Sequence, residues 1–199
     1  AFAHKIRLWN KLRTLPREKP HLFLFPDYSF AYLQIPKVAS RSIRAAVTAF
    51  MSDTAPDVDV DKNLVAEYET RYARHLKHVE IAALARDHFI FAFVRNPYER
   101  IYSCYKNKIE DARTSGRRNI FEKHGITFDV TFDEFVRKVA SLPDHKSDRH
   151  FRSQAWFLTH GGVLMPAFVG KLEQITEDWA ILNERFGIAP PAQINASSK

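Results

Sequence analysis

FIFAFVRNPYERIYSCY, residues 89–105, joins an almost continuous apolar run to a segment with helical spacing. The run FIFAFV is rich in β-favouring residues, as is typical of a strand that is buried on both faces of a parallel sheet. Asn96 suits the N-cap of a following helix, and Pro97 suits its first residue. This stretch therefore predicts a central strand, a short turn and a helix.

The same order of elements precedes this stretch. Apolar runs at residues 22–25 and 30–35 predict two neighbouring strands, separated by a turn at Pro26-Asp27. From Ser40 onward, apolar residues recur at helical spacing. Repeated strand, turn and helix units favour an α/β fold with three layers, in which helices flank a central parallel sheet.

Other segments predict the remaining elements. Apolar residues at helical spacing predict a helix within residues 64–76, and a capping box at Thr131 predicts the next one. A short strand is expected at residues 167–169. The last predicted helix begins at Thr176 and ends at Gly187.

The turn QIPKVASRS, residues 34–42, combines a strand end with cationic and hydroxyl side chains. We expect Lys37, Ser40, Arg41 and Ser42 at a helix N-terminus, where free backbone N–H groups and the helix dipole attract an anion. The ATP-binding pattern GxxxxGK[ST] fits poorly, because this turn has no glycine. The alternative is an ordinary serine-capped helix beside a solvated lysine.

The second turn brings Arg95 to the end of the central strand, and Arg100 and Ser103 lie one turn apart on the following helix. This arrangement could grip a second phosphate in a bidentate fashion. Alternatively, Arg95 could pair with Glu99, and Ser103 could be a packing residue. Because ligands of α/β sheets bind beyond the carboxyl ends of the strands, both turns are expected at one site.

Composition limits the classes of partner. Lys and Arg number 30 against 23 Asp and Glu, and the net charge of +7 favours anionic partners. The basic residues are scattered and match no nucleic-acid-binding pattern, so no nucleic acid is expected.

Cys104 is the only cysteine, which excludes an intrachain disulfide and suits a reducing compartment. No apolar run approaches the ~20 residues that span a bilayer. These features predict a single domain over residues 1–199 and a cytoplasmic location, with membrane association left open.

IPKVASRSI and FAFVRNPYERIYSCY together resemble two motifs of one enzyme family. They resemble the 5′-phosphosulfate-binding loop and the 3′-phosphate-binding strand and helix of sulfotransferases that use 3′-phosphoadenosine 5′-phosphosulfate (PAPS). The likeness is strongest to carbohydrate sulfotransferases and their bacterial relatives, and it runs from Phe30 to Gly187. It implies a P-loop-like fold. Family members commonly continue past residues 195–197, so the resemblance allows for a chain truncated at its C-terminus, and for a Golgi lumen location if the chain is a piece of a luminal domain.

The resemblance implies transfer of a sulfuryl group from PAPS to a hydroxyl of a carbohydrate or glycolipid-like acceptor by in-line displacement, with release of 3′,5′-adenosine bisphosphate. Lys37 is expected at the bridging oxygen and the transferring group. Arg41 departs from the family pattern, which often has a small hydroxyl residue there. The implied donor-binding residues are Lys37, Ala39, Ser40, Arg41, Ser42, Arg95 and Ser103.

The acceptor proton requires a base, and His78 is the predicted one, because Lys77-His78-Val79 lies where relatives carry a histidine. Four rivals stay open: His75, His150, Glu67 and Glu173. His150 and Gln154 are expected near the acceptor. No metal is expected, because the lone cysteine and the dispersed histidines lack zinc spacing.

Two other functions remain as alternatives. The first is a P-loop kinase-like phosphotransferase that uses ATP and Mg²⁺, which the absence of a glycine-rich loop disfavours. The second is a non-catalytic anion-binding module that keeps the turn but lacks a base. Oligomeric state is not indicated.

Overall fold

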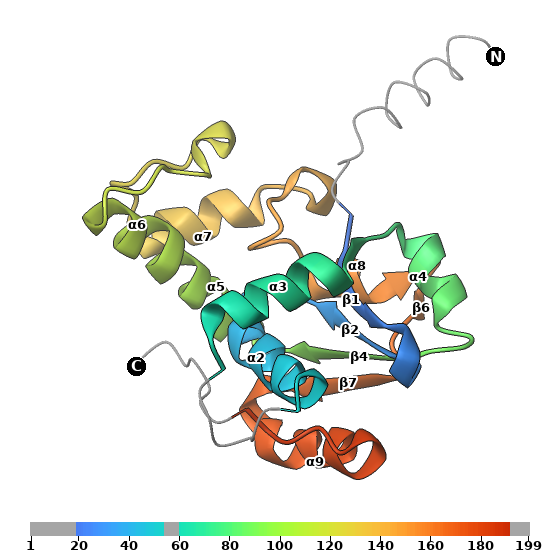
Figure 1. The fold of residues 1–199 in the computed structure, drawn as a ribbon. Helices are drawn as coiled ribbons and strands as arrows, with labels where there is room; N and C mark the ends of the chain where they lie inside the picture. The colour runs from blue at the N-terminus through green and yellow to red at the C-terminus, as the bar shows by residue number, and fades with distance from the viewer. Residues whose placement is uncertain (1–18, 54–59, 192–199) are drawn as a thin grey trace, which may run out of the picture.

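The computed structural model describes residues 19–53 and 60–191 of the 199-residue chain, and it is built around a five-stranded sheet (Figure 1). The strand order is β3-β1-β2-β4-β7. The strands are β3 (Ala73–His75), β1 (His21–Phe25), β2 (Phe30–Gln34), β4 (Phe89–Val94) and β7 (Phe168–Lys171). Parallel pairs join β2 to β4 and β4 to β7.

The sheet is mixed, which corrects the prediction of a parallel sheet. β1 runs antiparallel to both β2 and β3. The reason is the short 3₁₀ helix η1 (Pro26–Tyr28), which lets Phe25 pair directly with Phe30. A parallel connection would need a crossover of about a dozen residues. The prediction that β1 and β2 are neighbours is confirmed.

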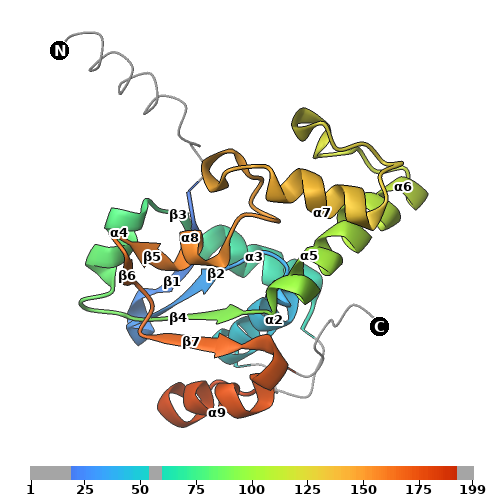
Figure 2. The same ribbon diagram turned by 180° about the vertical axis from the view of Figure 1, so that it is seen from behind.

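Helices cover both faces of the sheet, so the layers are helix, sheet and helix (Figures 1 and 2). On one face lie α2 (Ser40–Met51) and α3 (Lys62–Tyr72). On the other face lie α4 (His78–Leu84) and α8 (Gln154–Leu158). A further helix, α9 (Ile175–Phe186), contacts β7 and ends at Gly187 as predicted, and the φ of 74° at this glycine is left-handed.

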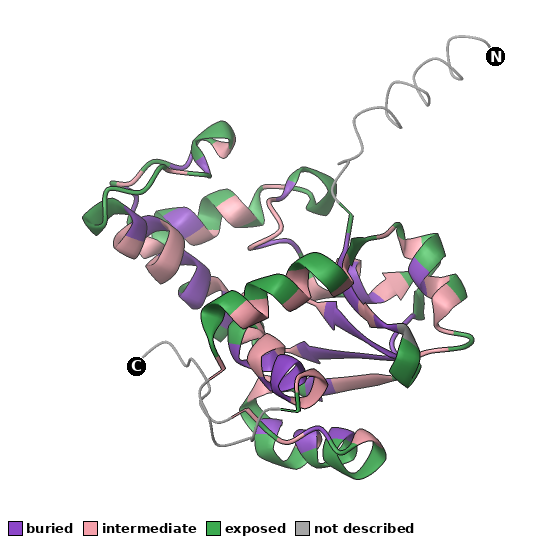
Figure 3. Cartoon of the chain, in the orientation of Figure 1, coloured by how far each residue is buried: buried purple, intermediate pink, exposed green. Residues whose placement is uncertain are grey.

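Aromatic side chains hold α9 against the sheet. Phe93 of β4 stacks on Trp179 with ring centroids 5.5 Å apart, and Phe30 of β2 contacts Phe186 at 5.0 Å. These rings belong to a continuous buried cluster under the helices, seen as the purple strands in Figure 3. Burial on both faces of β4 agrees with its nearly uninterrupted apolar sequence.

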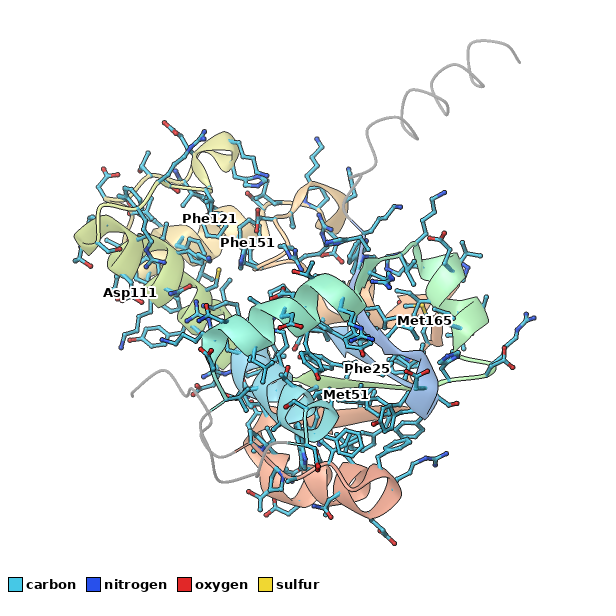
Figure 4. The ribbon with its side chains drawn as sticks, viewed as in Figure 1. Phe25, Met51, Asp111, Phe121, Phe151 and Met165 are labelled. Atoms are coloured by element: carbon cyan, nitrogen blue, oxygen red, sulfur yellow. The ribbon has the colours of Figure 1, made fainter. Side chains whose placement is uncertain are left out.

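A second apolar cluster lies beside the sheet. The helix α5 (Pro97–Tyr105) continues through a π-helix, η2 (Lys106–Glu110), into α6 (Asp111–Thr114), and α7 (Phe132–Ala140) packs against it. Phe121 and Phe151 lie between these helices (Figure 4). The cluster also contains Cys104, Tyr105, Ile109, Ile126, Val130 and Phe135.

Most predicted elements are present. Thr131 caps α7 with the expected capping box, in which its hydroxyl accepts from the Glu134 amide. The helix predicted within residues 64–76 ends at Tyr72, because the next three residues pair with β1. Short elements were not predicted, namely α4, α8, the hairpin β5 (Thr159–His160) and β6 (Val163–Leu164), and the 3₁₀ helices η3 (Glu122–His124), η4 (Asp144–Lys146) and η5 (Leu172–Gln174).

Candidate functional site

The two predicted turns meet at one edge of the sheet. β2 and β4 are parallel neighbours, so the turn after Gln34 and the turn after Val94 leave the sheet side by side. The first turn leads into α2 and the second into α5. Both helix N-termini therefore lie at the carboxyl ends of the strands, where an anion is favoured.

The turn before α2 has an unusual backbone. Lys37 and Ala39 have φ angles of 71° and 56°, although neither is glycine. Each left-handed residue costs about 1–2 kcal/mol, and such conformations concentrate at binding and catalytic sites. Val38 between them is fully buried and anchors the turn. Alternation of this kind turns successive amides toward one side and creates a concave anion site.

The N-terminus of α2 is capped by a residue that cannot supply a side-chain acceptor, because Ala39 occupies the N-cap position. The hydroxyl of Ser40 points back and donates to the carbonyl oxygen of Ile35 at 2.8 Å. Ser40 thus braces the turn in this structure. Ser42 is buried, whereas Arg41 is exposed.

Lys37 lies in a cluster of cations. The pKa of its ammonium is lowered to about 8, chiefly by burial and in part by the neighbouring charges of Lys108, Arg41 and Arg95. Within the described residues, Lys37, Arg41 and Lys108 form no ion pair. Lys37 and Lys108 are half-buried, and a cation partly removed from water without a carboxylate partner is costly, so this arrangement favours an anionic ligand.

Arg95 is fixed at the end of β4. Its side chain is nearly buried, and its Nη2 atom lies 3.0 Å from Oε2 of Glu99, so the alternative ion pair predicted from the sequence is present. The carboxylate of Glu99 is 52% exposed, which makes the pair weak and replaceable by a ligand phosphate. Asn96 caps α5 by accepting from the amides of Tyr98 and Glu99, as predicted.

Arg100 has a structural task that the sequence analysis missed. Its guanidinium is buried and donates to three carbonyl oxygens: Pro36 at 3.0 Å, Arg152 at 2.8 Å and Arg149 at 3.4 Å. It therefore ties the first turn to the segment before α8. Ser103, one helical turn further on, is also buried. The sequence signal was the spacing of Arg100, Ser103 and Cys104, which puts all three on the inner face of α5.

His78 is the first residue of α4 and is held by α8. Its Nε2 atom lies 2.6 Å from the carbonyl oxygen of Trp156, and its ring meets the Trp156 ring edge-on. Because a carbonyl can only accept, Nε2 carries the proton, and Nδ1 is left as the acceptor in the neutral ring. β3 points in the same direction as β2, so the segment that follows it, including His78, leaves the same edge of the sheet.

The rival bases have different environments. Asp148 holds His150 through a 2.7 Å contact between Oδ1 and Nδ1. The ring of His75 stacks on His21 at 4.5 Å. Glu173 accepts from the backbone amide of Asn96 at 2.6 Å, and Glu67 is exposed on α3. Among these rivals, His150 combines partial burial with an orienting carboxylate.

Gln154, expected near the acceptor, binds the backbone of Arg95 in this structure. In residues 19–53 and 60–191, no group of three or more His, Cys, Asp or Glu side chains is arranged to hold a metal ion. Over the same residues, no helix combines the length and apolar character needed to cross a membrane.

Comparisons with known proteins agree with this geometry. The sequence model of a family described as "Sulfotransferase family" matches residues 20–199. Carbohydrate sulfotransferase 14 of Danio rerio is 25% identical over 179 residues, which cover 84% of this chain and 48% of that protein. The protein of the same name from Homo sapiens is 27% identical over 176 residues, which cover 83% and 46% respectively. The chain thus spans about half the length of these relatives. No solved structure matches.

Proposed function

Because this chain belongs to the sulfotransferase family, we propose that it transfers a sulfuryl group from PAPS to a hydroxyl of a carbohydrate or glycolipid-like acceptor. The observation that carries the proposal is the cluster of Lys37, Arg41 and Arg95 at the paired ends of β2 and β4, beside a strained turn. Lys37 and Arg95 are held largely out of water beside two helix N-termini, and such a setting fits a ligand with several anionic groups.

The two turns would divide the donor between them. Lys37, Ala39, Ser40, Arg41 and Ser42 would hold the 5′-phosphosulfate at the N-terminus of α2. The turn before α2 would then bind the donor as a P-loop binds phosphate, although this turn has no glycine. In the second turn, Arg95 and Ser103 would hold the 3′-phosphate, and the phosphate would replace Glu99 at the Arg95 guanidinium. Arg100 of α5 binds the Pro36 carbonyl oxygen and so joins the second turn to the first, which supports a single domain.

Bound PAPS supplies an activated sulfuryl group whose S–O bond to the 5′-phosphate breaks as the acceptor oxygen forms a new S–O bond. Lys37 stabilises the negative charge that develops on the departing phosphate oxygen. His78 would remove the acceptor proton at Nδ1, while its Nε2 keeps its own proton and donates it to the Trp156 carbonyl oxygen. The turn and helix N-terminus hold the reacting groups in line.

A carbohydrate acceptor is supported by the relatives, which are named carbohydrate sulfotransferases, and by the net charge of +7, which favours acidic partners. The kinase-like alternative has less support, because the α2 turn lacks the glycines of an ATP-binding loop. A non-catalytic module would bind the nucleotide and show no turnover.

Calorimetric titration with 3′,5′-adenosine bisphosphate tests the proposal, with ATP, with and without Mg²⁺, and 5′-AMP as comparison ligands. We expect the wild type to prefer the bisphosphate, and Arg95→Ala to weaken that binding at least tenfold. Arg86→Ala removes an exposed arginine before the start of β4, at the end of the strand opposite to Arg95, and serves as the matched control. Preference for ATP with Mg²⁺ would refute the sulfotransferase proposal and favour the kinase alternative.

A further inference from the structure

Lys108 lies in a widened helical turn next to the proposed donor site. The segment Lys106–Glu110 is a π-helix, closed by a bond from the Asp111 amide to the Lys106 carbonyl oxygen. Single π-turns inside α-helices are frequent at functional sites, because they change which side chains face inward. The change of register is visible in Cys104 and Ile109, which are five residues apart and are both buried in the second apolar cluster.

The same five-residue step relates Lys108 to Ser103, one of the proposed 3′-phosphate ligands. Lys108 is half-buried, although it carries a charge. With ordinary α-helical spacing, the residue four positions after Ser103 would be the neutral Asn107. The π-turn therefore replaces a neutral amide by an ammonium at this position of the inner face.

Lys108 is within electrostatic range of both sides of the site. Its charge acts on Lys37 and on His150, and it experiences the charge of Arg41. The carboxylate in its range is Asp148, which contacts His150 at 2.7 Å and Lys123 at 3.8 Å. Lys108 itself forms no ion pair within the described residues.

Two half-buried ammonium groups that repel each other, with no carboxylate bound to either, create a strong local preference for an anion. Lys37 belongs to the turn that would hold the 5′-phosphosulfate. Lys108 belongs to η2, which continues the helix α5 that follows the second turn. An anionic group of the donor that lies near Lys37 would therefore also be attracted by Lys108.

We infer that Lys108 is a further donor-binding residue, which contacts the non-bridging oxygens of the sulfuryl group from η2, while Lys37 approaches from the turn before α2. This inference rests on the proposed function. Lys108 is not among the residues proposed to bind the two phosphate groups. It would bind the sulfuryl group, and the π-turn positions it for this contact.

The test compares two nucleotides that differ in the sulfuryl group, PAPS and 3′,5′-adenosine bisphosphate, by calorimetry without any acceptor. For Lys108→Met we expect PAPS to bind about tenfold more weakly, while the bisphosphate binds within twofold of the wild type. Lys106→Met removes a charge from the same π-turn and should change neither affinity. Lys108→Arg should recover much of the PAPS affinity, and Lys108→Gln provides a polar replacement should the Met variant fail to fold.

Other outcomes separate the two proposals. Equal weakening of both nucleotides by Lys108→Met would overturn the sulfuryl assignment, because the lysine would then act on the phosphates or the fold. Unchanged binding of both would also overturn it. A wild type that binds the bisphosphate normally keeps the proposed function in either case, whereas a wild type that binds neither nucleotide refutes the function and this inference together.

Discussion

Gln154 binds the backbone of Arg95 in both directions: its Nε2 donates to the Arg95 carbonyl oxygen at 2.8 Å, and its Oε1 accepts from the Arg95 amide at 2.9 Å. The two residues are 59 positions apart. Arg95 directly follows β4, where its main chain would otherwise lose its strand partners. Gln154 therefore extends the hydrogen bonding of the sheet by one residue and fixes the direction in which the Arg95 guanidinium leaves it.

Replacing Gln154 by Ala should weaken both stability and nucleotide binding. Two partly buried backbone groups lose their partners, which costs about 1–3 kcal/mol in the free energy of unfolding. Because Arg95 is then less well oriented, we expect the affinity for 3′,5′-adenosine bisphosphate to fall about threefold to tenfold. Urea unfolding and calorimetry measure the two effects.

Gln174→Ala is the matched control for this variant, since Gln174 is exposed and does not cap α9 with its side chain. It should change neither quantity. If Gln154→Ala lowered stability but left nucleotide affinity intact, the orienting role assigned to Gln154 would be wrong.

Lys37 should make nucleotide affinity depend on pH. Burial lowers the pKa of its ammonium to about 8, so the charge that attracts the ligand is lost as the pH rises through that value. Affinity for the bisphosphate should therefore be constant near pH 7 and fall by up to about tenfold per pH unit above pH 8. Lys37→Arg keeps its charge and should flatten this decline; a decline of the same size in both proteins would contradict the assignment.

The same shift affects stability with the opposite trend. The folded-state pKa of Lys37 lies below that of an unfolded lysine, near 10.5, so the unfolded chain binds more protons between pH 8 and 10.5. The Lys37 contribution to stability is therefore unfavourable at neutral pH and is relieved as the pH rises through this window. Lys37→Met should unfold at a higher urea concentration than the wild type at pH 7, and the difference should shrink by pH 10. A Met variant less stable than the wild type at pH 7 would show that the ammonium has a partner.

Ala39 has a left-handed backbone, with φ of 56° and ψ of 32°, which glycine adopts without strain. Ala39→Gly should therefore raise the free energy of unfolding by about 1 kcal/mol. Ala45→Gly, within α2, should lower it by about 1 kcal/mol. Urea unfolding of the pair checks the opposite signs. Destabilisation by both variants would mean that the turn is not strained.

The strands that carry the site were predictable because burial on both faces requires uninterrupted apolar runs, as in Phe89–Val94. The prediction of a parallel sheet was wrong for β1, which runs antiparallel to its neighbours. The gap of four residues between Phe25 and Phe30 is too short for a parallel crossover, and this spacing contained the answer. β3 is three residues long and has no pattern of its own, because its pairing with β1 determines its structure.

The site was predictable where function depends on adjacent residues and hidden where it depends on distant ones. Arg95 follows β4 directly and Lys37 lies three residues after the end of β2, so the order of elements placed both at the carboxyl ends of strands. The bonds of Gln154 to Arg95 and of Arg100 to Pro36 join residues 59 and 64 positions apart, and no local pattern encodes them. Lys108 lies just beyond the stretch from which this helix was predicted, and the π-turn that contains it has no simple sequence signature.

A variant at His78 distinguishes an effect on catalysis from an effect on nucleotide binding. As the proposed base, it acts on the acceptor proton and makes no contact with the nucleotide phosphates. His78→Ala should therefore slow transfer at least about a hundredfold and leave the affinity for the bisphosphate within twofold of the wild type. The rate is measured with sulfur-labelled PAPS and whichever glycan the wild type modifies in an acceptor screen.

His145→Ala, which removes an exposed histidine from η4, is the control and should transfer at the wild-type rate. His150→Ala addresses the rival that Asp148 orients. If His78→Ala turned over normally while His150→Ala did not, the base would be His150, and the bond from His78 to the Trp156 carbonyl would serve to join α4 to α8. A slow His78 variant with weakened bisphosphate binding would instead indicate that this bond shapes the nucleotide site.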